Sequence, residues 1–290
     1  MEVNLDYEEE TAWQFLLRKN ADGLFLKSCV PELDSILCMA SGKIYEIDGE
    51  IGSGKTQICY SIVAKLLNSK KDAMVGWLSP TALRTDDLQK HLNAEVPLAF
   101  GIPGIFVDFQ LHLDSLFCAI CEDVDELKKC VDSIVAMRDS RKVRLVVVEN
   151  IDTILHDTVY IDYQRGYQYQ ERVIEKFNLL AKNGITVIVT NHITRWRGYP
   201  APALGRFWSS KIANRFFVEK TDETRVISKR IDGGDEQVIS AKFRITSNGL
   251  EFSRLTDTID RQAVAACRSP ARCGSSPPPS VFKRLRENMR

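Results

Sequence analysis

Residues 45–57 read YEIDGEIGSGKTQ, and they carry the strongest indication of the fold in the chain. Gly49 to Thr56 match the pattern G-x-x-x-x-G-K-[ST], which is the signature of a phosphate-binding P-loop. The apolar segment KIYEID before it is typical of a strand, and the segment TQICYSIVAKLLN after it has its apolar residues spaced as in a helix. A strand, a glycine-rich turn and a helix in this order predict a nucleotide site.

Each residue type in the turn has a physical role. Glycines allow main-chain amides to turn inward on the β-phosphate, and the helix N-terminus adds partial positive charge. Lys55 is expected to contact the β- and γ-phosphates, and Thr56 is expected to bind Mg²⁺. The alternative is a glycine turn without a ligand. The predicted nucleotide-binding residues are Gly49, Glu50, Ile51, Gly52, Ser53, Gly54, Lys55, Thr56 and Gln57.

A P-loop site also needs an acidic residue at the end of a second strand, which holds the metal ion and its water. The segment RLVVVEN supplies four apolar residues and then Glu149, so Thr56 and Glu149 are the predicted Mg²⁺ residues, with Asp152 as an alternative. The usual residue at this position is aspartate, and a glutamate places its carboxylate about one methylene further out. Metal binding tolerates that change more easily than catalysis does, because a misplacement of about 1 Å can cost on the order of 100-fold in rate.

Composition narrows the class of protein. The chain has 290 residues, 44% of them apolar, which is enough for one large core or two modest ones. Lys plus Arg and Asp plus Glu both number 39, so any basic surface must be local. The acidic N-terminus does not resemble a secretory signal, and no apolar run reaches the length that spans a bilayer. We therefore expect an intracellular protein with no membrane partner.

The order of segments predicts an α/β chain with a mostly parallel central sheet. Short runs rich in Val and Ile are typical of buried parallel strands, and segments with helical spacing separate them. After residue 214 polar alternation and an Asn248–Gly249 turn predict antiparallel strands. The predicted domains are a helical lead-in over 1–40, a core over 41–253 and a disordered basic tail rich in Pro and Ser over 254–290. The predicted core strands include AMVGWLS, IFVDF, RLVVVEN and ITVIVTN.

Cysteines suggest neither disulfides nor zinc. The chain has eight, without regular spacing. Cys118 and Cys121 form a C-x-x-C with Cys130 beyond it, but no second C-x-x-C or paired histidine completes a tetrahedral site. We expect these residues to be buried thiols on a helix.

Five segments occur in a recognisable order: LDSIL, GEIGSGKTQ, TNHITR, PALGRFWS and AKFRITSNGLEF. Over roughly residues 33–252 the chain resembles the eukaryotic RecA-like recombinases, especially their paralogues that do not form filaments. TNHITR followed by PALGRFWS is most similar to the D-type paralogues. The resemblance implies a RecA-like P-loop ATPase core that uses ATP and Mg²⁺ in homologous recombination, in the nucleus.

The chain departs from filament-forming members of this family. They carry a glutamate that orients the attacking water, and the alignment of GWLSPTALRTDDL places Pro80 there, so no catalytic residue is predicted. The chain has about 40 residues in place of their N-terminal DNA-binding domain and lacks their F-x-x-A docking segment. We therefore expect slow ATP hydrolysis and no homopolymer. The expected partners are another paralogue, the filament-forming recombinase and single-stranded DNA.

By the same resemblance, two loops contact single-stranded DNA. The first falls within HDTVYIDYQRGYQYQ, and the alternative for that segment is a helix or a partner-facing surface. The second runs from Thr194 to Ala203. Asn191 and His192 occupy the place where the family senses the γ-phosphate, with a structural histidine as the alternative. The predicted DNA-binding residues are Arg165, Tyr167, Arg195, Trp196 and Arg197.

These features favour an ATP-binding mediator that helps to assemble, remodel or stabilise recombinase filaments together with another paralogue. The alternative is an active DNA-dependent ATPase, such as a strand-exchange recombinase or a RecA-type motor, in which Glu50 or a partner's carboxylate replaces the missing glutamate. A small-molecule or nucleoside kinase fits less well, because no lid or substrate motif is visible.

Overall fold

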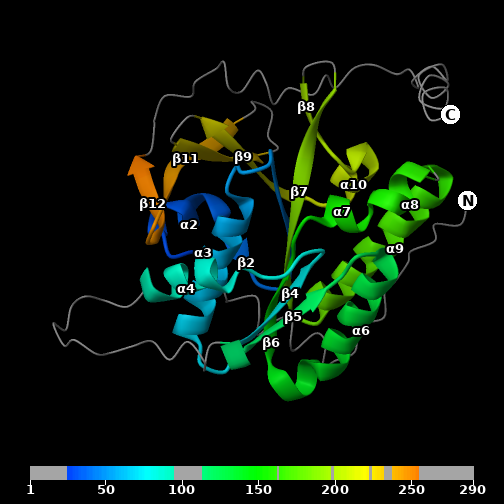
Figure 1. Ribbon diagram of the computed structural model, residues 1–290, viewed down its shortest axis with the longest axis horizontal. Helices are drawn as coiled ribbons and strands as arrows, with labels where there is room; N and C mark the ends of the chain where they lie inside the picture. Colours follow the sequence, from blue (N-terminus) through cyan, green and yellow to red (C-terminus); the bar gives the residue numbers. More distant parts are fainter. Residues whose placement is uncertain are drawn as a thin grey trace, which may run out of the picture.

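The computed structural model describes residues 25–94, 113–161, 163–196, 199–221, 224–231 and 237–254. Within these ranges ten strands form one sheet with helices on both faces (Figure 1). Nine of them lie in the order β12-β11-β10-β9-β3-β7-β6-β4-β5, and β8 pairs with β7 outside this row. The strands are β3 (Ile44–Gly49), β4 (Met74–Ser79), β5 (Leu116–Ile120), β6 (Val143–Val148), β7 (Thr186–Trp196), β8 (Tyr199–Pro202), β9 (Asn214–Thr221), β10 (Thr224–Ile231), β11 (Gln237–Thr246) and β12 (Gly249–Arg254).

The predicted fold class is confirmed. Strand β3 pairs in parallel with β7 and β9, and β6, β4 and β5 continue the parallel part. Strands β9 to β12 pair antiparallel. The predicted hairpin near Asn248 joins β11 to β12, and Gly249 has a φ of 109°, a conformation that glycine adopts readily.

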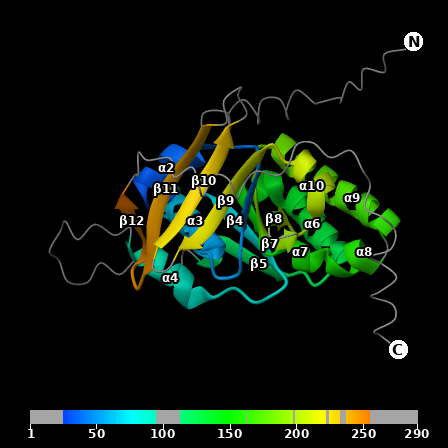
Figure 2. The ribbon, with the colours of Figure 1, turned by 90° about the horizontal axis from the view of Figure 1, so that it is seen from above.

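Two helical layers cover the sheet (Figure 2). One face carries α2 (Pro31–Leu37), α3 (Lys55–Ser69) and α4 (Thr85–Ala94). The other carries α6 (Val124–Arg141), α7 (Ile151–Ile154), α9 (Tyr163–Lys182) and α10 (Gly205–Lys211), with α8 (His156–Ile161) leading into α9.

The pleat of β3 divides its side chains between these two layers. Tyr45 and Ile47 pack in the core on the α3 face. Ile44 packs in the core on the α9 face, so Glu46 and Asp48 point the same way. Both carboxylates are buried, and β3 therefore brings two acidic side chains into the layer beneath α9.

The sheet edge corrects the sequence interpretation of the cysteines. Cys118 lies on β5 and Cys121 directly follows that strand, so neither is on a helix, and Cys118 is exposed. Pairing with β4 fixes LFCAI as a strand, although its few β-branched residues gave a weak local signal. The expected strand IFVDF lies outside the described residues.

The described part of the N-terminal lead-in contains α2 between two short strands, β1 (Phe25–Leu26) and β2 (Met39–Ala40). Residues 1–24 and the predicted tail from 255 lie outside the described residues. Where the chain is described, no helix has the length and apolar character needed to cross a membrane.

Candidate nucleotide site

The glycine-rich turn joins β3 to α3, as the sequence predicts. A Cβ at position 49 would lie 2.5 Å from the Val218 carbonyl oxygen and 2.6 Å from Ser53 Oγ, so only glycine fits there. Gly54 has a φ of 105° and caps α3. A Cβ on Gly52 would meet nothing within 4 Å, so the turn faces open space at that point. The glycine pattern is thus required by the backbone as well as by a phosphate.

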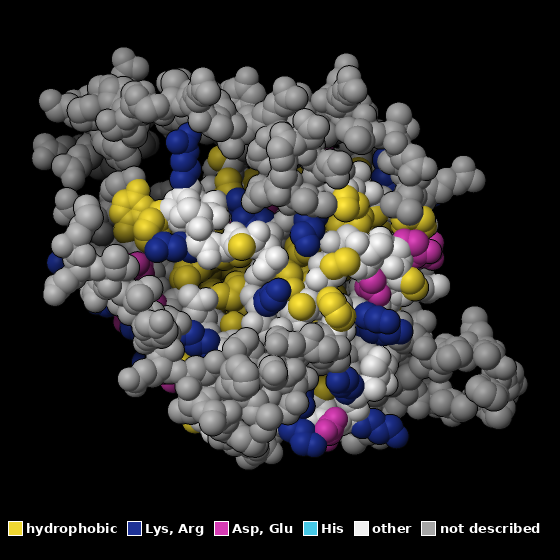
Figure 3. Space-filling model, turned by 180° about the vertical axis from the view of Figure 1, so that it is seen from behind, with side chains coloured by type: hydrophobic (Ala, Val, Ile, Leu, Met, Phe, Trp, Pro, Cys, Tyr) yellow, Lys and Arg dark blue, Asp and Glu magenta, His cyan; other side chains and the backbone are white. Residues whose placement is uncertain are grey.

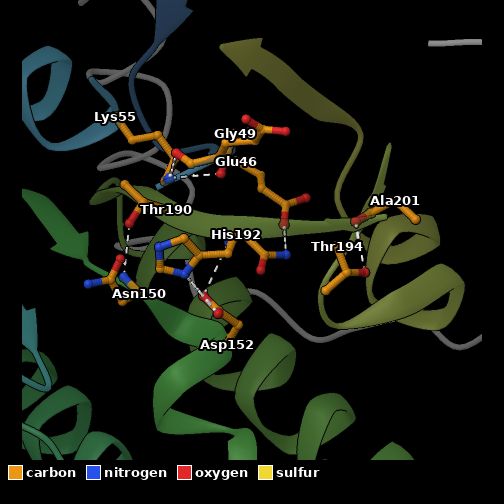
Figure 4. Close-up of polar contacts among 11 residues, drawn as sticks. Glu46, Gly49, Lys55, Asn150, Asp152, Thr190, His192, Thr194 and Ala201 are labelled. Atoms are coloured by element: carbon orange, nitrogen blue, oxygen red, sulfur yellow. Dashed lines mark hydrogen bonds and ion pairs between the residues drawn. The ribbon is translucent and has the colours of Figure 1, made fainter. Parts of the chain in front are cut away.

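Lys55, the first residue of α3, is buried. Its Nζ donates hydrogen bonds to the carbonyl oxygens of Gly49 at 2.8 Å and Glu50 at 2.9 Å (Figure 4). Burial lowers the pKa of Lys55, and the charges of Asp152, Asp48 and Glu149 oppose that shift. Hydrogen bonds to neutral carbonyls stabilise a buried ammonium less than bonds to an anion do. A phosphate would therefore be a stronger acceptor for Lys55 than these two carbonyl oxygens.

The two predicted metal residues lie together. Thr56 Oγ1 donates a hydrogen bond to Glu149 Oε1, although 93 positions separate them in the chain. Ser79 Oγ, at the end of β4, donates to Glu149 Oε2 over 3.4 Å. Glu149 follows β6, which pairs in parallel with β4, so the carboxyl ends of both strands meet the P-loop at one edge of the sheet. This is the edge at which open α/β sheets bind ligands.

Pro80 directly follows Ser79 at that same edge. It is partly buried, and it offers neither an N–H donor nor a side-chain base. Pro80 therefore offers no acid–base group at this edge, next in the chain to Ser79, whose hydroxyl contacts Glu149.

His192 and Asp152 form a pair next to the turn. His192 Nδ1 lies 2.8 Å from Asp152 Oδ2, and the His192 main-chain N–H donates to Asp152 Oδ1 over 3.2 Å. Asp152 lies on α7, and its charge is the largest influence opposing the lowered pKa of Lys55. The pair therefore links the middle of β7, just before the β7–β8 hairpin, to the P-loop lysine through a carboxylate.

Asn191, the other predicted sensor, points to the opposite face of the sheet. It is fully buried, and its Nδ2 donates to Glu46 Oε1 at 2.8 Å. The same oxygen accepts from Trp208 Nε1 at 2.7 Å, and Glu46 Oε2 accepts from Arg215 Nε at 2.7 Å. Sequence reasoning missed this cluster, although acidic residues at alternate positions of an apolar strand, Glu46 and Asp48, were a visible signal.

Arg215 joins the two carboxylates of β3, because its Nη2 also donates to Asp48 Oδ2. Burial and the charge of Glu46 raise the pKa of Asp48 well above its usual value, and Arg215 opposes the shift. Burial disfavours the charge of Arg215, but Asp48 and Glu46 more than offset it and raise its pKa. Two buried carboxylates sharing one guanidinium favour a proton on Asp48.

Gln57, the last predicted nucleotide residue, faces α4. Its Oε1 lies 2.9 Å from Nε2 of the buried His91. Burial lowers the pKa of His91 to about 4, so the ring is neutral at physiological pH. A Cβ on Gly249 would lie 2.9 Å from His91 Nδ1, which places the β11–β12 hairpin against the ring. Sequence reasoning assigned His91 no role.

The first predicted DNA loop is helical, which corrects the expectation of a loop. Arg165 and Tyr167 lie on α9, and Arg165 is exposed. The Tyr167 ring meets Phe207 of α10 edge to face, with centroids 4.9 Å apart. A helix was the alternative for this segment, and that alternative is confirmed.

The second predicted DNA loop is largely a hairpin of β7 and β8, with Thr194 opposite Ala201. Arg195 and Trp196 are the last residues of β7, and Trp196 pairs with Tyr199. Arg197 lies outside the described residues. The hairpin extends β7 beyond the sheet (Figure 1), and His192 lies at its base.

The residues at the turn fit a Mg²⁺–nucleoside triphosphate. Ser53 Oγ is buried without a hydrogen-bond partner in the described part of the chain, and Lys55 and the α3 N-terminus supply positive charge. Within those residues no three His, Cys, Asp or Glu side chains converge to hold a metal by themselves. Mg²⁺ bound by Thr56 and Glu149 would complete its shell with phosphate oxygens and water, as is usual for this ion.

A P-loop sequence between β3 and α3, with a carboxylate after the parallel strand β6, defines a P-loop protein with a RecA-like core. No protein-family model matches the chain.

Curated proteins define the family more closely. The chain is 47% identical over 250 residues to RAD51-like protein 1 of Caenorhabditis briggsae, covering 85% of this chain and 97% of that protein. It is 45% identical to RAD51-like protein 1 of Caenorhabditis elegans over 84% of this chain and 96% of that protein. It is 27% identical to DNA repair protein RAD51 homolog 4 of Mus musculus, over 68% of this chain and 61% of that protein.

The chain therefore belongs to the RAD51-like family of RecA-like recombinase paralogues. The predicted resemblance is confirmed, and the similarity to RAD51 homolog 4 agrees with its D-type character. Membership supports a role in homologous recombination.

Proposed function

We propose that this chain binds ATP with Mg²⁺ at residues 49–57 and acts as a mediator in homologous recombination. Together with another paralogue, it helps to assemble, remodel or stabilise recombinase filaments on single-stranded DNA in the nucleus. Bound ATP acts mainly as a conformational ligand, which favours the state that binds it more tightly.

One observation carries this proposal: Thr56 donates a hydrogen bond to Glu149 at the carboxyl edge of the sheet. The family resemblance sets Pro80, which directly follows β4, at the position of the water-orienting acid. Thr56 and Glu149 would hold Mg²⁺ beside the phosphates. Glu149 is held by Thr56 and Ser79, whereas Pro80 cannot accept a proton. ATP hydrolysis should therefore be slow, which suits a protein that is regulated by nucleotide binding rather than driven by hydrolysis.

The route from nucleotide to partner runs along β7. His192 and Asp152 lie between Lys55 and the β7–β8 hairpin, which carries Arg195 and Trp196 at its end.

On the face opposite that of Figure 1, Lys and Arg side chains are spread among apolar ones, and acidic side chains are sparser (Figure 3). A local basic surface with apolar area suits contact with single-stranded DNA or with an acidic partner.

Capture of partners in the presence and absence of ATP tests the proposal. We expect the wild-type chain to retain a paralogue or the recombinase more strongly with Mg²⁺–ATP. Lys55→Ala removes the ammonium from the turn and should lower ATP affinity by roughly 10- to 100-fold, since hydrogen bonds to charged groups contribute about 1.5–3 kcal/mol. It should also abolish the nucleotide dependence of capture. Lys71→Ala, an exposed residue beyond the same helix, is the matched control.

Full ATP affinity in Lys55→Ala would remove the foundation of the proposal. Capture that is equally strong with and without ATP would contradict the conformational role, even if ATP binds.

The Asp152–His192 pair favours a second candidate, the DNA-dependent ATPase. A carboxylate that is oriented by an imidazole and lies near Lys55 has the chemistry needed to position water. Steady-state ATP hydrolysis with and without single-stranded DNA separates the two functions. Turnover near one per second or faster, which is ordinary for an enzyme, would favour the ATPase.

A further inference from the structure

Two thiols outside the nucleotide site face each other. The Cys121 Sγ–H donates to Cys130 Sγ, and the two sulfur atoms are 3.6 Å apart. Cys121 is fully buried directly after β5, and Cys130 is partly exposed on α6. Both pack in the core cluster on the α6 face of the sheet. This contact has no part in the nucleotide site described above.

A tight connection brings the two residues together. Asp123 caps α6 by accepting the Glu126 main-chain N–H at 2.8 Å, and Glu126 Oε2 accepts the Glu122 N–H at 2.9 Å. These reciprocal bonds start the helix immediately after the strand and turn it back along the sheet. Cys130 lies seven residues, about two helical turns, after Asp123 and is therefore on the same side of α6 as the helix start, where its sulfur faces Cys121.

Cys118 does not take part, although it forms the C-x-x-C with Cys121. Phe117 and Ala119 of β5 pack against the α6 cluster. Side chains alternate along a strand, so Cys118 points to the other face, where it is exposed. The sequence motif and the spatial pair are different sets of cysteines.

We propose that Cys121 and Cys130 are a redox modification site, which closes to an intramolecular disulfide when the protein meets a peroxide. At rest, in a reducing compartment, both residues are thiols.

The chemistry has two steps. The partly exposed Cys130 sulfur attacks one oxygen of hydrogen peroxide, the O–O bond breaks, and Cys130 sulfenic acid and water form. The Cys121 sulfur then attacks the Cys130 sulfur, the S–O bond breaks, and the thiol proton leaves with the hydroxyl as a second water. Two thiols are oxidised and one peroxide is reduced to two waters. Burial raises the pKa of Cys121 to about 12, which makes the second step slow at neutral pH.

Formation of the disulfide would affect the nucleotide site through a main-chain hydrogen bond. The Cys121 N–H donates to the Ser79 carbonyl oxygen at 2.9 Å, and Ser79 Oγ donates to Glu149 over 3.4 Å. The sulfur atoms must approach by about 1.5 Å to reach the roughly 2.05 Å of a disulfide. The Ser79–Glu149 contact is already long, so we expect oxidation to weaken Mg²⁺-dependent nucleotide binding. This consequence rests on the proposed function, whereas the disulfide itself does not.

Peptide mapping of the full chain tests the disulfide. After peroxide treatment and alkylation of the remaining thiols, trypsin cleavage at Lys128 and Lys129 separates Cys121 from Cys130. We expect these two peptides to be joined, with loss of two hydrogens, and to be released by dithiothreitol. Cys118→Ser should keep the link, which is needed because Cys118 and Cys121 share a tryptic peptide. Cys130→Ser should abolish it.

Cys38, which is exposed and lies on another part of the fold, is the internal control for access of peroxide. Oxidation of Cys38 without any link between Cys121 and Cys130 would overturn the proposal. A link that survives in Cys121→Ser would do the same, because it would assign the bond to Cys118. Circular dichroism spectra and melting temperatures of the variants establish that each one folds.

A fluorescent ATP analogue with Mg²⁺ tests the consequence. The Kd of the oxidised protein should rise by at least about twofold, a change of roughly 0.4 kcal/mol. The rise should be reversed by dithiothreitol and be absent in peroxide-treated Cys130→Ser. Equal Kd values for linked and reduced protein would overturn the coupling and leave the disulfide standing. Failure of the reduced wild-type protein to bind the analogue would instead contradict the proposed function.

Discussion

Asn191 Nδ2 donates a hydrogen bond to Glu46 Oε1 at 2.8 Å, and this bond joins the neighbouring parallel strands β7 and β3 on the face of the sheet away from α3. His192, the next residue, lies on the other side of the pleat with Asp152. The predicted pair of sensors is therefore divided. Asn191 holds the middle of β7 from the other face of the sheet, and His192 is the member of the pair on the side of the P-loop lysine.

The first prediction concerns the stability supplied by Glu46. Glu46→Ala leaves Arg215 facing Asp48 alone and deprives Asn191 and Trp208 of their acceptor. We expect the free energy of unfolding to fall by about 3–5 kcal/mol, as when one partner of a buried ion pair is removed. Trp208→Phe removes a single donor and should cost roughly 1–2 kcal/mol. Urea unfolding measures both, and equal losses would contradict this ranking.

The second prediction concerns His91 and acid. The pKa of His91 is lowered by burial to about 4, against about 6.5 in the unfolded chain, so the unfolded state binds more protons between these values. The contribution of neutral His91 is complete above pH 6.5 and is lost as the pH falls toward 4, by up to about 3 kcal/mol. Asp87 raises this pKa and Lys90 lowers it, both less than burial does.

His91→Gln should therefore flatten the fall in unfolding free energy between pH 6.5 and 4. Urea unfolding at several pH values gives the comparison. His156→Gln is the control, because His156 is largely exposed and beside Asp157 at the surface. A variant at position 91 that keeps the wild-type slope would show that another group causes the acid sensitivity.

The third prediction concerns the metal. Glu149→Gln keeps the size of the side chain and can still accept from Thr56, but it loses the charge that attracts Mg²⁺. We expect ATP affinity with EDTA to change by less than about twofold, and the gain in affinity on adding Mg²⁺ to be largely lost. Titration with a fluorescent ATP analogue measures both. An unchanged gain would assign the metal to Asp152 instead.

The fourth prediction separates the two segments proposed to contact DNA. Arg195→Ala alters the end of β7, whereas Arg165→Ala alters an exposed position on α9. We expect Arg195→Ala to weaken single-stranded DNA binding by roughly tenfold, since a lost arginine contact costs about 1–3 kcal/mol. Arg165→Ala should change it by less than about twofold, because Tyr167 on the same helix packs on Phe207. Fluorescence anisotropy at fixed salt checks both, and the reverse order would assign the DNA contact to α9.

Much of the site follows from local pattern. The order of strand, glycine turn and helix around Gly49 predicts where a phosphate binds, because the glycines, Lys55 and the helix N-terminus are neighbours in the chain. Glu149 is predictable for a similar reason, since a charged residue that ends a run of four apolar ones marks the end of a buried strand.

Other features depend on which segments meet in space. Nothing local to LFCAI distinguishes an edge strand from a helix, and its pairing with β4 decided the matter. The predicted loop around Arg165 became a helix because its apolar side packs on α10 and on the sheet, which overrides a polar and aromatic composition.

A RecA-like P-loop core and the residues that would hold a triphosphate can be inferred from local sequence, because short-range spacing sets backbone geometry and burial. The contacts of Asn191 with Glu46, of His91 with Gln57, and of Cys121 with Cys130 rather than Cys118 emerge from the folded arrangement alone. They depend on the pleat of each strand, which assigns side chains to opposite faces, and on how those faces pack against distant segments.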